Sequence, residues 1–281
     1  MKFNWRKFIN LIIITTVYCT FIAALRFGNN TIEIIKAILV VPTYSLWFIV
    51  CYLILMPLAP FINRFVDTIN QKDFKNLIII LVIILCVLPT LSVKGATNGI
   101  VLQQGGKNLV YFLFLYILGR YLRLHNDINY NRWGLLGGHI ICTLLIVGLN
   151  VLVSNVLNMR FVAFRFDCSP LILISSLCVF YLFKSWNYHS RIINWLASSV
   201  FGFYLLSNIY YVINERYIHL ETFSQDTRFV LFLIVLVLAA FVFSLVVDKT
   251  FGSLMKWIFV KIEDFCEPKI KNSKLYKRIK Q

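Results

Sequence analysis

Long uninterrupted runs of apolar residues constrain this chain more than any other feature of its sequence. Crossing the roughly 30 Å hydrocarbon core of a bilayer takes a helix of about 20 apolar residues. Eight runs approach that length, at 7–26, 44–65, 74–91, 108–124, 133–156, 170–186, 193–213 and 229–250. Because lipid offers backbone groups no hydrogen-bond partner, continuous runs predict helices, whereas a membrane barrel would show alternating polarity. The sequence therefore predicts an all-α, polytopic membrane bundle of about eight helices.

The composition agrees with burial in lipid. Hydrophobic residues make up 59% of the chain and charged residues 14%, and the mean hydropathy is +0.77. A soluble protein of 281 residues could not bury that much apolar surface. The seven cysteines show no CxxC spacing and no pattern with histidine. We therefore expect the lipid bilayer as a partner, and neither a metal site nor a tightly bound cofactor.

Lysine and arginine in the connections set the expected orientation. If the N-terminus is cytoplasmic, more of these residues fall on the cytoplasmic side, chiefly because of the basic segment from Lys249 to Lys280. We expect both termini in the cytoplasm, with a transmembrane domain at 1–255 and a basic tail at 256–281. The tail supplies much of the net charge of +16. We interpret it as contacting anionic lipid headgroups rather than nucleic acid.

Three stretches carry a recognisable pattern in a fixed order. They are "WFIVCYLILMPLAPFIN" from Trp47, "GGKNLVYFLFLYILGRYLRLH" from Gly105 and "IINWLASSVFGFYLLSN" from Ile192. Together they resemble acyltransferase family 3, whose multi-span membrane O-acyltransferases modify bacterial polysaccharides. The resemblance implies acetyl-CoA as the co-substrate and a polysaccharide or lipid-linked glycan as the acceptor. It also implies a location in the bacterial cytoplasmic membrane.

The front of the chain departs from the family's usual pattern. Members usually open with a span that carries an arginine and a histidine regarded as essential, but the first histidine here is His125. The opening residues instead resemble the family's third span. We therefore expect about two spans to be missing and the activity of this chain to be impaired, which the genomic DNA upstream of Met1 would test. A second departure is Ser207, where the family commonly has histidine.

Acyl transfer from a thioester to a hydroxyl needs cations for the donor's phosphates and a base for the hydroxyl proton. The candidate cations are Arg6 and Lys7 at the inner end of the first run, and Arg120 and Arg123 at the inner end of the fourth. Positive-inside anchoring would explain both pairs as well. The candidate base is His139, which lies inside the fifth run. Its glycine neighbours also allow a structural role, in which the histidine bonds an adjacent helix.

Aromatic and polar residues in the resembling stretches suggest a path for the acceptor. By the resemblance we expect Trp47, Tyr52, Tyr204 and Ser207 to line it. Trp47 is equally explained as part of an interfacial aromatic belt, and Tyr52 as a residue that fills the bundle.

Prolines are expected to interrupt two of the runs. Pro57 and Pro60 remove backbone donors near the end of the second run, so the helix there should kink or stop. Asn63 follows them and is expected to bond the freed carbonyls. Pro89 is expected to break the third run.

Two other functions remain open on the sequence alone. The chain could be a transporter or flippase subunit, which predicts paired ionisable residues deep within the spans. His139 is almost the only candidate of that kind. The chain could also be a non-catalytic membrane component of a glycan assembly system.

Overall fold

The protein is helical over most of the part that its computed structural model describes. That part comprises residues 5–28, 30–39, 46–91, 104–125, 131–158, 161–184, 186, 188–206, 229–253, 257 and 261. No strand occurs within these residues. Six helical stretches among them are long and apolar enough to cross a membrane: Lys7–Ala24, Trp47–Thr68, Gln71–Leu91, Arg132–Leu157, Ala163–Lys184 and Phe229–Thr250. The predicted class, a helical membrane bundle, is confirmed.

The chain folds as two compact units, and each is described by itself. Unit 1 comprises Met1–Phe3 and Leu46–Tyr188, and unit 2 comprises Asn4–Ser45 and His189–Gln281. The predicted division into 1–255 and a tail at 256–281 stays a prediction, because only Trp257 and Lys261 of that tail are described.

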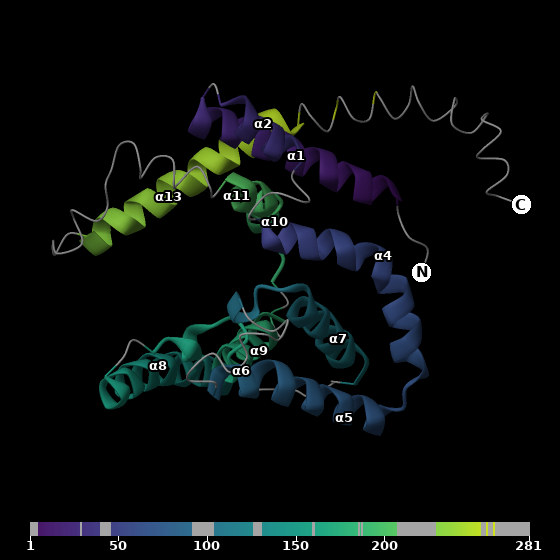
Figure 1. Cartoon of the computed structure of the whole chain (residues 1–281), viewed down its shortest axis with the longest axis vertical. Coiled ribbons are helices and arrows are strands. Elements are labelled where there is room, and N and C mark those ends of the chain that lie inside the picture. The colour runs from purple at the N-terminus through teal and green to yellow at the C-terminus, as the bar shows by residue number, and fades with distance from the viewer. Residues whose placement is uncertain are drawn as a thin grey trace, which may run out of the picture. The chain divides into compact units, whose positions relative to one another are not determined.

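Unit 1 holds the central helices of the chain (Figure 1). They are α4 (Trp47–Thr68), α5 (Gln71–Val82), η1 (Ile83–Val87), α6 (Leu88–Leu91), η2 (Gln104–Gly106), α7 (Leu109–His125), α8 (Arg132–Leu157), η3 (Ala163–Arg165) and α9 (Pro170–Lys184). Asparagines start three of them, because their side-chain oxygens accept orphan backbone N–H groups of the first turn. Asn70 accepts from Asp73, Asn108 from Tyr111 and Asn131 from Trp133.

The prediction that Pro89 breaks the third run is wrong. The helix continues from α5 through the π-helical turn η1 into α6, which contains Pro89, and the stretch Gln71–Leu91 is long enough to span. In η1 the backbone hydrogen bonds join residues five apart instead of four, and the N–H of Leu88 bonds the carbonyl of Ile83. A π turn is one way in which a helix accommodates a disturbance without ending. The hydroxyl of Thr90 also donates to the carbonyl of Cys86 at 2.8 Å.

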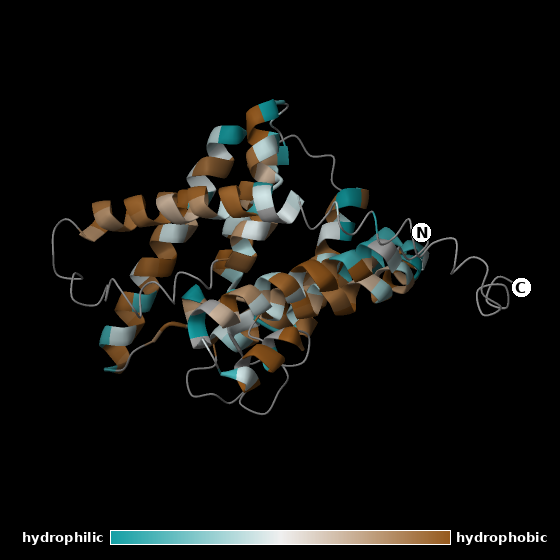
Figure 2. Cartoon of the chain, turned by 90° about the horizontal axis from the view of Figure 1, so that it is seen from above, coloured by the Kyte–Doolittle hydropathy of each residue, from teal (hydrophilic) through white to brown (hydrophobic). Residues whose placement is uncertain are grey.

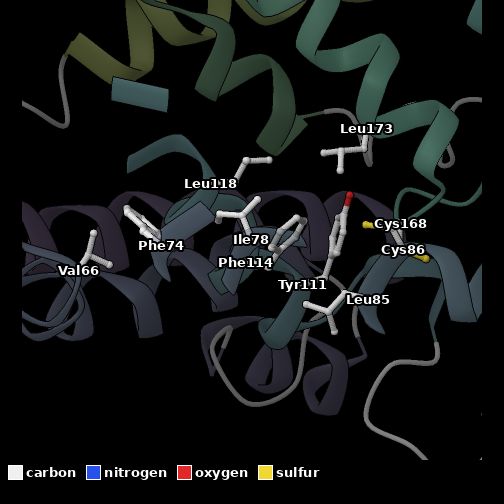
Figure 3. Packing of buried hydrophobic residues seen from close by; sticks show 10 residues of the cluster. All are labelled: Val66, Phe74, Ile78, Leu85, Cys86, Tyr111, Phe114, Leu118, Cys168 and Leu173. Carbon is white, nitrogen blue, oxygen red and sulfur yellow. The ribbon is translucent and has the colours of Figure 1, made fainter. Parts of the chain in front are cut away.

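A hydrophobic cluster joins helices α4, α5, α7 and α9 in unit 1. Figure 3 shows it as an elongated row of side chains: Val66, Phe74, Ile78, Leu85, Cys86, Tyr111, Phe114, Leu118, Cys168 and Leu173. The hydroxyl of Tyr111 donates to the backbone carbonyl of Asp167 at 2.8 Å. This bond satisfies the polar end of a ring that is otherwise buried.

A close backbone contact ties η2 to the loop before α9. Gly106 has a φ of +92°, and a Cβ at this position would lie 2.7 Å from the backbone nitrogen of Cys168. Only glycine fits both the dihedral angle and the approach.

Unit 2 contains the N-terminal helices and the late helices of the chain. They are α1 (Trp5–Phe27), α2 (Thr31–Ile38), α10 (Arg191–Ala197), α11 (Val200–Leu206), α13 (Phe229–Val247) and the π turn η6 (Asp248–Gly252). Helix α11 contacts α1, α13 and η6, and α1 contacts α2. In Figure 1, α11 lies beside the lime-green α13.

Apolar side chains lie on the outward faces of the helices as well as on the faces where helices pack together. Figure 2 shows hydrophobic residues along most of the helical ribbons, with hydrophilic residues gathered mainly at helix ends. On α13, Val230 and Leu231 are each 65% exposed. Such surfaces are stable next to lipid tails and not next to water.

Two predicted spans are shorter than the other six in the described residues. Helix α7 has 17 residues. The stretch Arg191–Leu206 is the other short apolar helix, and the residues after it lie outside the described part. Eight spans therefore stay a prediction.

Candidate functional site

An ion pair links the ends of helices α4 and α7. The Nη2 atom of Arg120 lies 2.7 Å from Oδ1 of Asp67, and the side chains are 23% and 51% exposed. The Nε atom of Arg120 is buried and has no hydrogen-bond partner among the described residues. Asp67 thus occupies one N–H donor of the guanidinium, on Nη2, and the Nε donor is buried. An anion could bind only through the Nη donors that Asp67 does not occupy.

A second polar contact lies one helical turn before the ion pair. The Tyr116 hydroxyl donates to Oδ1 of Asn63 at 3.1 Å. Asn63 precedes Asp67 by four residues on α4, and Tyr116 precedes Arg120 by four on α7. Residues at this spacing share a helix face, so two polar rungs connect the same pair of faces. This contact corrects the expectation for Asn63: its carbonyl oxygen accepts from another helix, and no bond from it to a freed carbonyl is found among the described residues.

Aromatic side chains connect the start of α4 to the start of α7. The ring centroids of Phe48 and Phe112 are 5.4 Å apart, and those of Trp47 and Phe112 are 6.5 Å apart. Tyr52 stacks on Phe48 at 6.3 Å and is 42% exposed. The Trp47 ring also meets the Phe48 ring edge to face, with centroids 6.1 Å apart. Trp47 and Tyr52, both predicted for the acceptor path, therefore both contact Phe48.

The contacts of α4 require that helix to bend. Phe48 and Asn63 are 15 residues apart, which is about 22 Å along a straight helix. Their partners Phe112 and Tyr116 are only four residues apart on α7, or about 6 Å. Figure 1 shows the α4 ribbon changing direction, and Pro57 and Pro60 lie inside it. The prolines thus kink α4 without ending it, and both of its ends reach α7.

The remaining predicted cations are distributed between the two units. Arg123 is exposed, three residues after Arg120 on α7. Lys7 is exposed on α1 in unit 2. Arg6 lies on the same helix, and its side chain lies outside the described part. Arg120 and Arg123 therefore form one group, and the pair on α1 belongs to another unit.

His139 lies at the contact between α8 and α9. Its Nδ1 atom is 2.7 Å from Oγ of Ser175, which is buried on α9. A Cβ on the neighbouring Gly138 would lie 3.1 Å from Sγ of Cys178, so the two helices are close there. This is the geometry of the structural role that the sequence left open for His139.

Tyr204 is half-buried on α11 in unit 2. The other residue predicted for this part of the acceptor path, Ser207, lies outside the described residues. The acceptor candidates Trp47 and Tyr52 belong to unit 1.

The site contains residues that the sequence reasoning missed. Asp67, Tyr116, Phe112 and Ser175 were not singled out, although each contacts a predicted residue or its neighbour. A signal existed for two of them, because Asp67 follows Asn63 and Tyr116 precedes Arg120 at helical spacing. No feature of the sequence indicated that α4 packs against α7.

Comparison with known proteins places the chain in a family. No match was found among curated proteins or among solved structures. The family model described as acyltransferase domain, that of acyltransferase family 3, matches residues 1–249 of the 281. Together with the apolar helices, this match makes the chain a multi-pass membrane protein of an acyltransferase class. The chain belongs to acyltransferase family 3.

Proposed function

We propose that this protein transfers an acetyl group from acetyl-CoA to a hydroxyl of a cell-surface or capsular polysaccharide, in the bacterial cytoplasmic membrane. In this reaction the acceptor oxygen bonds to the thioester carbonyl carbon, and the carbon–sulfur bond breaks. The hydroxyl loses its proton, and the CoA thiolate gains one. Family membership supports acyl transfer, and the helices support a membrane location.

The proposal that the protein binds acetyl-CoA rests on the guanidinium of Arg120, which Asp67 holds in place. Asp67 fixes its orientation at 2.7 Å, and its Nε–H has no partner among the described residues. Arginine binds phosphate through parallel N–H donors in a rigid fork, and fixing the fork beforehand reduces the entropy lost on binding. We therefore assign Arg120 to the phosphates of the donor, with Arg123 beside it.

The acceptor side rests on the aromatic residues at the start of α4. Tyr52 and Trp47 present large, rigid apolar faces: Tyr52 stacks on Phe48, and Trp47 meets Phe48 edge to face. A sugar ring has apolar C–H faces that can pack on such rings. The bend of α4 brings this aromatic end and the polar end of the same helix to one neighbour, α7.

The test measures transfer of radiolabelled acetyl groups in membrane vesicles that contain the full chain. The acceptor is de-O-acetylated surface polysaccharide from the organism that encodes the chain. We expect Arg120→Gln to raise the KM for acetyl-CoA about ten- to a hundredfold, the cost of one charge-assisted hydrogen bond.

Lys75→Gln is the matched control. Lys75 is an exposed cation on α5 in the same unit, and it makes no hydrogen bond or ion pair with the described residues. If both variants change the KM equally, Arg120 does not bind the donor. If wild-type vesicles move glycan without CoA and transfer no acetyl group, the proposed reaction is wrong and a transport function replaces it.

A further inference from the structure

A carboxylate lies at the end of the apolar helix α13. Asp248 is the first residue of the π turn η6, and it belongs to the stretch Phe229–Thr250, which is long and apolar enough to cross a membrane. Its side chain is half-buried. The charge of a carboxylate in such a place is costly unless another group compensates it, and π turns are frequent at functional sites. Asp248 is therefore a candidate binding position.

Uncharged groups contact this carboxylate. The hydroxyl of Tyr18 on α1 donates to Oδ1 of Asp248 at 3.3 Å. A Cβ at Gly202 on α11 would lie 2.7 Å from the same oxygen, and a Cβ at Gly252 would lie 3.0 Å from it. The two glycines thus leave the space beside the backbone that the carboxylate occupies.

The neighbouring Lys249 does not neutralise Asp248. Its Nζ atom donates to Oγ of Ser198 at 2.6 Å and to the carbonyl of Trp195 at 3.1 Å. Among the described residues, no lysine or arginine forms an ion pair with Asp248. The described part of the chain therefore supplies no cation to balance this carboxylate.

Buried hydroxyl side chains lie one helical turn from the residues at the carboxylate. The pairs, with the hydroxyl residue first, are Thr15 and Tyr18 on α1, Ser199 and Gly202 around the start of α11, and Ser244 and Asp248 on α13 and η6. Residues three or four apart share a helix face. Helix α11 contacts α1, α13 and η6, all in unit 2. The three hydroxyls are therefore directed to the same helix contacts as the carboxylate.

Two of these hydroxyls have no hydrogen-bond partner within the described residues. They are Oγ1 of Thr15 and Oγ of Ser199, and each residue is 1% exposed. A helical threonine can satisfy its hydroxyl with a carbonyl one turn earlier, as Thr20 does with Thr16 at 2.8 Å. A buried hydroxyl that makes no such bond costs free energy. The two oxygens are thus available to a ligand.

The third hydroxyl shows that α13 directs its polar side inward. Ser244 is the only polar residue of that helix and its only buried residue. Its buried position next to the carboxylate's turn leaves apolar residues on the outward face of α13. Polar groups of unit 2 thus gather inside a helix contact that is otherwise apolar.

We propose that a monovalent metal cation, Na⁺ or K⁺, binds at the carboxylate of Asp248. The hydroxyl oxygens of Tyr18, Thr15 and Ser199 are the neutral ligands, because a hydroxyl that donates one hydrogen bond keeps lone pairs for a cation. One carboxylate balances one positive charge. No group of three or more His, Cys, Asp or Glu side chains that could hold a metal ion occurs in the described part, so the charge count favours a monovalent ion. The proposal uses contacts within unit 2 alone and is independent of acetyl transfer.

Binding of radioactive sodium to the full chain in lipid nanodiscs tests the site. Choline keeps the ionic strength constant, since it carries the same charge but cannot take the place of a metal ion among oxygen ligands. We expect saturable binding of one ion per chain, and Asp248→Asn should abolish it. Unlabelled K⁺ that displaces the label better than unlabelled Na⁺ would identify K⁺ as the preferred ion. Hydroxyls that bind only water predict no saturable binding, and that result would overturn the proposal.

Thr15→Val tests the neutral ligands without removing the charge. The change keeps the shape of the side chain and deletes the hydroxyl, so we expect the affinity for sodium to fall about tenfold. The variant should fold at least as well as the wild type without the ion, because it loses an unpaired buried hydroxyl. Thr20→Val is the matched control on the same helix, since the Thr20 hydroxyl already bonds its own backbone. Equal affinities in the two variants, or unchanged binding in Asp248→Asn, would contradict the assigned ligands.

Discussion

The bond between His139 and Ser175 is the residue-scale feature that decides how His139 is interpreted. Its 2.7 Å length and the burial of Ser175 fit a link between two helices. In membrane proteins such side-chain bonds contribute about 0.6 kcal/mol on average and rarely more than about 1.7. His139 therefore need not be the base in order to be retained inside a span.

We predict that His139→Ala and Ser175→Ala each lower the free energy of unfolding by about 1 kcal/mol. The double variant should lose less than the sum, because either change alone removes the shared bond. Unfolding in mixed detergent micelles measures this. Thr143→Ala is the control, since its hydroxyl bonds a carbonyl of its own helix. Loss of acetyl transfer in His139→Ala without loss of stability would instead make His139 catalytic.

The contact between α8 and α9 depends, at the scale of the helices, on a small residue. A side chain at Gly138 would meet Cys178 at 3.1 Å, whereas a Cβ at the adjacent Gly137 would meet nothing within 4 Å. Close approach over small residues is how membrane helices gain packing, because lipid supplies no hydrophobic drive between them.

We predict that Gly138→Leu separates α8 from α9 and lowers the free energy of unfolding by about 1–3 kcal/mol. Gly137→Leu is a control one residue away on the same helix, and it should have a much smaller effect. Thermal unfolding in detergent distinguishes the two variants. Equal destabilisation would mean that helix propensity, and not contact with α9, sets the cost.

The number of membrane crossings is the open question at the scale of the whole molecule. Helix α7 has 17 residues, about 26 Å, slightly less than the roughly 30 Å of hydrocarbon. A modest local thinning of the bilayer would allow it to cross. If α7 and the helix at Arg191–Leu206 both belong to crossings, the total is eight and the two termini share a side.

We predict that alkaline phosphatase, which is active only outside the cytoplasm, is active when fused after Gly106 and inactive when fused after His125. These positions flank α7, so the pair of fusions tests that helix alone. A C-terminal fluorescent protein should fold in the cytoplasm. Activity at both phosphatase fusions would mean that α7 lies in the membrane surface and that the count of spans is odd.

The sequence by itself determined the class of fold and the family. Runs of about 20 apolar residues leave helices as the available solution in lipid, whatever the partners of each helix. The three patterned stretches predicted acyltransferase family 3, and the match over residues 1–249 confirmed it. The sequence also predicted that the prolines in α4 would kink or stop that helix, and the helix does bend.

Only the tertiary structure decided which residues meet. The pairing of Asp67 with Arg120 joins positions 53 residues apart, and that of Tyr18 with Asp248 joins positions 230 apart. Membrane helices all carry similar apolar faces, so periodicity does not say which helices pack together. The same limit explains the error at Pro89: a proline changes the local hydrogen bonds, but packing and a π turn decided whether the helix ended.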